Sequence, residues 1–154
     1  MTKAELTNTI SEKTGIHKRE EQTGDITETP NVMRKEHEIA ECIKWGWVYH
    51  HTGIPTTEKK EGEVYIPHLK FYVSGFPTSP FGIEWMRFEE DCQMHPLVQK
   101  VPHIAFEVQD IEKEIRERKL TVLTPVNSPA DGILVAMIEH NGAPIELIQF
   151  ERGK

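Results

Sequence analysis

Two stretches of the chain repeat one arrangement, in which an apolar strand begins with histidine and a later apolar strand carries glutamate. The clearer copy runs from His103 to Glu146, and the other runs from His51 to Glu84. A unit that occurs twice predicts two related halves in which each histidine and each glutamate holds a corresponding place. The chain is therefore interpreted as a tandem of two similar modules.

The two copies differ in length, and the difference falls where a helix would lie. Forty-three positions separate His103 from Glu146, whereas 33 separate His51 from Glu84. In the longer copy Asp110 has the character of a helix cap, and Asn141-Gly142 is typical of a hairpin turn. The order predicted for that half is strand, helix, strand, strand and strand, over residues 103–108, 111–119, 121–126, 133–138 and 145–150. The shorter half predicts strands without a full helix, over residues 47–54, 64–66, 69–73 and 83–88.

The length of 154 residues suits one compact domain with an attached segment. Residues 1–45 are predicted to form an N-terminal tail with short helices and a charged linker. Residues 46–151 are predicted to form the domain, with modules at about 46–91 and 101–151. The polar start of the chain lacks the apolar core of a secretion signal, and no apolar run reaches the length of a membrane span.

Charge and cysteine content narrow the range of partners. The chain has 18 basic and 25 acidic side chains, a net charge of -7, which argues against binding to a nucleic acid backbone. Cys42 and Cys92 stand far apart and form no Cys-x-x-Cys pair, which fits a reducing compartment. We therefore expect a cytoplasmic protein that binds neither nucleic acid nor membrane.

The repeated residues also suggest a metal site. The two-residue period of a strand places Glu84 on the apolar face with Met86, and Glu146 on the apolar face with Ile148. A carboxylate buried there costs several kcal/mol unless it is paired, protonated or bound to a cation. Two imidazoles and two carboxylates would suit a divalent metal.

Two ordinary explanations stay open at this point. The histidines could be core residues satisfied by backbone groups, and the glutamates could pair with Arg87, Arg116 or a lysine. The same strand period predicts that His50 points to the face opposite His51, so that it is no ligand unless the register slips by one residue. Aromatic side chains near the first strand could line a pocket or belong to the core or a dimer contact; they are Trp45, Trp47, Tyr49 and Trp85.

Four segments resemble the vicinal oxygen chelate superfamily, also called the glyoxalase, bleomycin-resistance and dioxygenase superfamily. They are His51-Thr52-Gly53-Ile54, Ile83-Glu84, Pro102 to Val108 and Pro144 to Ile148. The resemblance covers about residues 46–151. It implies an α+β fold of two βαβββ modules that form a cupped, barrel-like mixed sheet around a divalent metal. The helix of the first module would be shortened or missing.

The resemblance also implies a ligand set and a cofactor. The metal positions of the superfamily fall on His51, Glu84, His103 and Glu146, which is the ligand set of glyoxalase I. The metal would be nickel, zinc, cobalt, manganese or iron. No arginine set suited to glutathione is identifiable, since Arg87 lies on the strand face opposite Glu84. A fourth, acidic ligand also argues against an extradiol dioxygenase.

The function implied is that of a metal-dependent lyase, isomerase or epimerase acting on a small oxygenated metabolite. The metal would act as a Lewis acid that stabilises an enediolate, and Glu146, or alternatively Glu84, would be the general base. A second hypothesis is a metal-free protein that sequesters a ligand, as bleomycin-resistance members do. An interaction module with four structural residues ranks third. The partners expected are a small-molecule substrate and a second copy of the chain in a homodimer.

Overall fold

The computed structural model describes residues 38–152. The chain divides into two units, Met1–Ile39 and Ala40–Lys154, and every described helix and strand lies in the second. The helix and linker predicted before residue 38 lie outside the described residues. None of the described helices has the length and apolar character needed to cross a bilayer.

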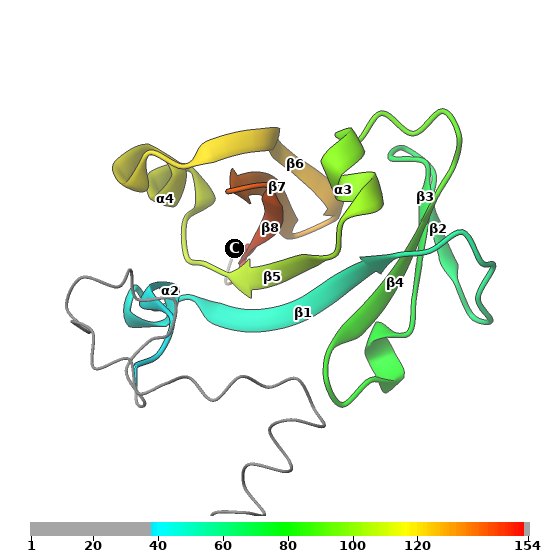
Figure 1. Cartoon of the computed structure of the whole chain (residues 1–154), viewed down its shortest axis with the longest axis horizontal. Helices are drawn as coiled ribbons and strands as arrows, with labels where there is room; N and C mark the ends of the chain where they lie inside the picture. Colours follow the sequence, from blue (N-terminus) through cyan, green and yellow to red (C-terminus); the bar gives the residue numbers. More distant parts are fainter. Residues whose placement is uncertain (1–37, 153–154) are drawn as a thin grey trace, which may run out of the picture. The chain divides into compact units, whose positions relative to one another are not determined.

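The second unit is built on one curled sheet of eight strands in the order β2-β3-β4-β1-β5-β8-β7-β6 (Figure 1). The strands are β1 (Val48–Pro55), β2 (Val64–Ile66), β3 (Phe71–Ser74), β4 (Ile83–Phe88), β5 (His103–Glu107), β6 (Thr121–Ala130), β7 (Ile133–His140) and β8 (Ala143–Phe150). The helices are α2 (Glu41–Lys44), α3 (Pro96–Lys100), α4 (Ile111–Arg118) and the 3-10 helix η1 (Phe76–Thr78).

The two halves of the sheet repeat one topology. In each half the first strand pairs in parallel with the last, β1 with β4 and β5 with β8, and the two intervening strands follow outward. The halves join through the antiparallel pair of β1 and β5. This arrangement confirms the predicted α+β fold of two modules in a cupped mixed sheet.

Only the second module has its helix between the first two strands. Helix α4 begins where the Asp110 carboxylate accepts a hydrogen bond from the Lys113 backbone N–H at 3.1 Å, and it ends at Lys119 in the left-handed region. Between β1 and β2 the chain makes bends and turns and no helix. The shortened first module predicted from the spacing is thus confirmed.

Strands β7 and β8 are buried on both faces, which explains their nearly continuous apolar sequence. On the outer face, Leu147 and its neighbours pack around α4 in a core of Trp47, Val108, Ile111, Ala136, Ile138 and Leu147. On the concave face, the alternate residues Val135, Met137 and Ile148 border a cavity. Cys42 of α2 packs against the core as well.

Strand β6 is longer than the segment 121–126 expected from the sequence. It continues to Ala130, with three shifts of register against β7, and contains Pro125 and Pro129. Proline removes a backbone donor and is tolerated at an edge, and β6 is an edge strand of this sheet. The prolines therefore bend the strand without ending it.

Replacing Leu147 should test whether the core beneath α4 determines stability. Leu147 is fully buried, so we expect Leu147→Ala to lower the free energy of unfolding by about 2–5 kcal/mol through lost burial and a cavity. Urea denaturation followed by circular dichroism measures the change. Ile104→Ala, at a position 46% exposed on the neighbouring strand β5, should cost less than about 1 kcal/mol. Equal losses would contradict this description of the core.

Candidate metal centre

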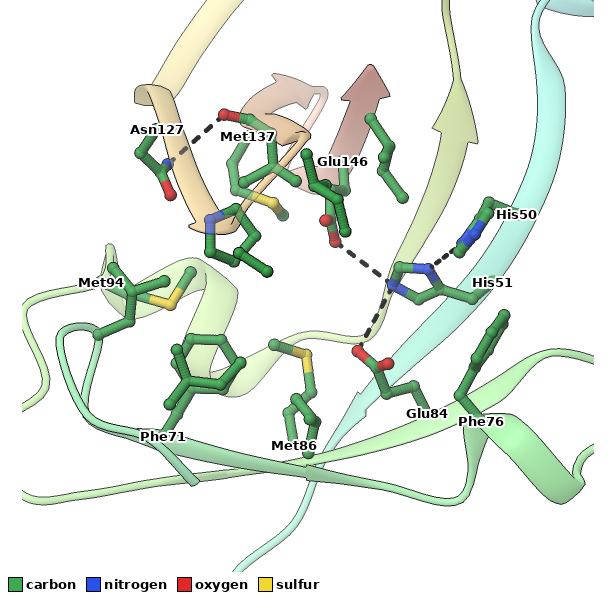
Figure 2. A pocket seen from close by; sticks show the side chains of 18 of the residues that line it. His50, His51, Phe71, Phe76, Glu84, Met86, Met94, Asn127, Met137 and Glu146 are labelled. Carbon is green, nitrogen blue, oxygen red and sulfur yellow. Dashed lines mark hydrogen bonds and ion pairs between the residues drawn. The ribbon is translucent and has the colours of Figure 1, made fainter. Parts of the chain in front are cut away.

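The sheet register brings the four predicted residues to one place on the concave face. In one row His51 of β1 lies opposite Ala105 of β5, which lies opposite Glu146 of β8. In the adjacent row Glu84 and His103 both lie opposite Gly53. Figure 2 shows the His51, Glu84 and Glu146 side chains directed toward one space.

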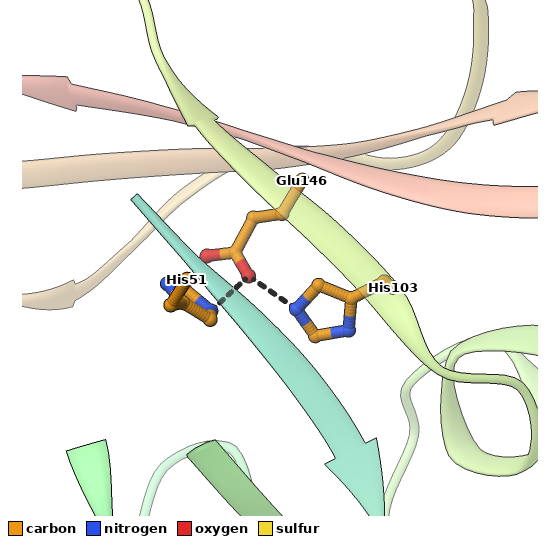
Figure 3. Close-up of side chains that lie close together, drawn as sticks. All are labelled: His51, His103 and Glu146. Atoms are coloured by element: carbon orange, nitrogen blue, oxygen red, sulfur yellow. Dashed lines mark ion pairs between the residues drawn. The ribbon is translucent and has the colours of Figure 1, made fainter. Parts of the chain in front are cut away.

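Glu146 lies between the two imidazoles. Its Oε2 is 2.8 Å from Nε2 of His103 and 3.4 Å from Nε2 of His51 (Figure 3). The ligand atoms of these three residues all lie within 4.8 Å of one another. Glu84 stands to one side, with Oε1 3.7 Å from Nε2 of His51, and does not belong to that group. The four predicted residues therefore form a triad and one neighbour.

The imidazole nitrogens that face Glu146 are buried and make no hydrogen bond within the described part of the chain. His51 and His103 are 4% and 1% exposed, and neither Nε2 atom has a hydrogen-bond partner among the described residues despite the adjacent carboxylate. A buried polar atom left without a partner costs roughly 1–3 kcal/mol. A divalent cation would satisfy both nitrogens and the carboxylate oxygen at once. Two imidazoles and a carboxylate suit zinc, nickel, cobalt, manganese or iron(II), so the residues fit such an ion.

Neither ordinary explanation accounts for the cluster. Neither ring nitrogen of His103 has a hydrogen-bond partner between residues 38 and 152, so no backbone group of that range satisfies it. Arg87 pairs with Glu63, through contacts of 2.5 Å and 3.0 Å, and not with Glu84. The ionisable side chains that contact Glu84 and Glu146 are histidines.

The electrostatics of the two carboxylates differ. Burial alone would raise the pKa of Glu146, but contact with His103 and His51 outweighs it and lowers the pKa to about 2. Burial raises the pKa of Glu84, and His51 only partly opposes the shift. Burial acts to lower the pKa of His51, but Glu146 and Glu84 raise it overall. Glu146 is thus the ionised partner of the imidazoles, and Glu84 is the carboxyl that holds a proton more readily.

His50 is not where the strand period predicted it. The pairing of β1 with β5 shifts register between Tyr49 and His51, and a bulge of this kind adds a residue to one strand. His50 and His51 therefore share a face, and their Nδ1 atoms form a 2.8 Å hydrogen bond. The expectation that His50 points to the opposite face is wrong. The bond occupies Nδ1 of His51 and leaves Nε2 for the cluster, which is how metal-binding histidines are commonly oriented.

The cluster lies in the wall of a cavity of about 380 Å³, within the range of small-molecule sites. Its aromatic lining consists of Phe71, Phe76 and Phe150. None of the tryptophans lines it, and Trp47 packs in the core beside Trp45. The strand period that places Ile148 on the face of Glu146 also places Phe150 there, whereas the sequence gives no signal for Phe71 or Phe76.

No protein-family model matches the chain, and no curated protein matches it. Solved structures do match the chain. A hypothetical protein from Bacillus halodurans C-125 matches with a TM-score of 0.55 and 20% identity, over 70% of this chain and 97% of that one. A methylmalonyl-CoA epimerase from Mycobacterium tuberculosis matches with a TM-score of 0.48 and 14% identity, over 66% and 87% of the two chains. The fold is shared with the Bacillus halodurans protein. At 20% identity this likeness concerns the fold and not the reaction.

Metal content tests the triad directly. We expect the full chain, purified without added metal and then supplied with zinc, nickel, cobalt, manganese or iron(II), to retain about one ion per chain. His103→Ala and Glu146→Ala should each weaken binding at least about 100-fold because each removes a direct ligand. Elemental mass spectrometry and competition with a chromogenic chelator measure both.

Two variants serve as controls for that measurement. Glu84→Gln should retain the ion, since Glu84 stands outside the triad. His140→Ala, at an exposed position in the β7–β8 hairpin, should have no effect. Retention of metal by the two triad variants would refute the site.

Gly53 is expected to be required for the position of His103. A Cβ atom at Gly53 would lie 2.1 Å from Cε1 of His103, closer than any real contact. We expect Gly53→Ala to lower the free energy of unfolding by about 1–3 kcal/mol and to weaken metal binding. Val48→Ala, at a position 58% exposed on the same strand, should change neither quantity. Thermal unfolding and metal titration measure the two effects, and normal values for Gly53→Ala would contradict the packing described.

Proposed function

We propose that this chain is a metal-dependent isomerase or epimerase of the vicinal oxygen chelate superfamily that acts on a small oxygenated metabolite. The observation that supports the proposal most is the buried triad of His51, His103 and Glu146, which borders a cavity and in which neither imidazole Nε2 has a hydrogen-bond partner among the described residues. The cupped sheet of two modules also supports it. A lyase reaction that begins with the same proton removal belongs to the same proposal.

His51, His103 and Glu146 would hold the ion, and Glu84 would move the proton. When bound, the metal supplies Lewis acid chemistry that polarises a substrate oxygen and acidifies the neighbouring C–H bond. Glu146 Oε2 is engaged by both imidazoles. Glu84 lines the cavity beside the triad, so its carboxylate is the better placed general base. The sequence had favoured Glu146 for that role.

The proposal does not extend to glyoxalase I itself. Among the described residues that line the cavity there is no lysine or arginine to bind the carboxylates of glutathione. The first module also lacks the helix that a complete βαβββ unit would have. Only three residues of the ligand set of glyoxalase I come together among the described residues, since Glu84 stands outside the triad.

A metal-free ligand-sequestering function of the bleomycin-resistance type is the second candidate. The size and apolar lining of the cavity favour it, because they suit capture of a small molecule without chemistry. The two candidates differ in their need for the ion. A sequestering protein would bind its ligand equally with and without metal.

Deuterium exchange tests the isomerase proposal. The substrate is a neutral acyloin that bears a benzyl group. In heavy water, the metal-loaded chain should replace the C–H proton next to its carbonyl with deuterium, and proton NMR follows the loss of that proton's signal. Glu84→Gln should keep the metal and slow exchange at least about 100-fold, because it removes the base. His140→Ala should exchange at the normal rate. Exchange that persists after chelation, or at full rate in Glu84→Gln, would overturn these assignments.

A further inference from the structure

The charged and polar groups of the cavity gather at one end. His50, His51, Glu84 and Glu146 lie together, and Figure 2 shows Phe71, Met94 and Asn127 away from them. Most of the remaining wall is aliphatic, aromatic or thioether, as in Ile66, Leu69, Val73, Met86, Met137 and Ile148. One end of the cavity can thus bind oxygen atoms. The rest, which we call the body of the cavity, offers almost no polar side chain among its described lining residues.

No basic side chain among the described lining residues faces this body. Two cations of the surrounding strands and loops, Arg87 and Lys60, have other partners. Arg87 pairs with Glu63 and stacks on Tyr72 with 4.0 Å between guanidinium and ring centroid. Lys60 pairs with Glu58 and lies over the Trp85 ring. A negative charge on a ligand would therefore find no counter-ion in the body of the cavity.

A second hollow adjoins the apolar end of the cavity, and its described residues offer no free positive charge to a ligand either. It shares Leu69, Met94 and Asn127 with the cavity. Its one cation, among the described residues, is Lys70, whose ammonium pairs with Asp91. A substrate long enough to reach it would meet a neutralised pair and not a free positive charge.

The metal would not supply the missing charge either. A divalent ion would be held by His51, His103 and Glu146 at the polar end, away from the body of the cavity. Burying an unpaired anionic group costs several kcal/mol. Binding a ligand whose anionic group lies away from the triad is therefore unfavourable.

We propose, on the basis of the function proposed above, that this site takes uncharged substrates that present oxygen to the polar end and carry an apolar group on the remainder. The site rejects molecules whose remainder carries a carboxylate or phosphate, such as glutathione conjugates and coenzyme A thioesters. The volume of about 380 Å³ limits the apolar group to the size of a small ring or short branched chain.

A matched pair of catechols tests this selectivity. Methyl protocatechuate and protocatechuate carry the same two oxygens and differ in a neutral ester against a carboxylate. Three of the chain's five methionines, Met86, Met94 and Met137, line the cavity, so methyl-¹³C methionine NMR reports binding inside it. We expect the ester to bind at least about tenfold more tightly than the acid to the zinc-loaded full chain.

A charge introduced at the apolar end provides the decisive variant. Met94 is half-buried where the cavity meets the second hollow, so Met94→Lys should be accommodated and should place a cation near the acid. It should reduce the preference for the ester to less than about threefold. Val48→Lys adds the same charge at a position outside the cavity and should leave the preference unchanged.

The outcomes separate this inference from the proposed reaction. A preference for the ester in the metal-free protein as well would support the substrate class even if no metal bound and no exchange occurred. Equal or tighter binding of the acid would overturn the substrate class even in a chain that catalyses metal-dependent exchange. Failure of both ligands to shift the three methionine signals would overturn it too.

Discussion

The contact of one carboxylate with two buried imidazoles is the constraint on which this structure depends. Glu146 stands on a strand whose other concave-facing side chains are apolar, and both histidines are almost wholly buried. Such a group of ionisable side chains is costly to bury unless its members satisfy one another or a cation. The contacts of Glu146 with His103 and His51 offset part of that cost, and a metal ion bound to the two Nε2 atoms, which make no hydrogen bond among the described residues, would offset the remainder.

The repeat of the module brings the two histidines and the two glutamates close together in the sheet. Since β1 and β5 are neighbours, the first strands of the two modules place their histidines in adjacent rows of one sheet. The last strands, β4 and β8, pair with β1 and β5 and carry Glu84 and Glu146. Gly53 and Ala105 stand between histidine and glutamate in the two rows, and their small size leaves room for the imidazole rings.

The surroundings of the cluster decide what chemistry it can serve. The bulge in β1 turns His50 toward the cavity, where its ring stacks on Phe76 and its Nδ1 orients His51. Glu84 lies beside the triad without belonging to it. The lining of the rest of the cavity is apolar, and a low local dielectric strengthens electrostatic effects on a bound substrate.

The resemblance to the vicinal oxygen chelate superfamily implied the cupped sheet and the set of four site residues. The sequence by itself determined the repeat of two modules, the missing first helix and the apolar strand faces on which Glu84 and Glu146 lie. These follow from strand period, turn signals and spacing, which are local properties of the chain. Only the tertiary structure decided that Glu146 and not Glu84 contacts both imidazoles, that a bulge moves His50 to the cavity, and that Phe71 and Phe76 line it. The reason is physical: period two fixes the face of a side chain, whereas distances across strands depend on register, bulges and loops that form only when distant segments pair.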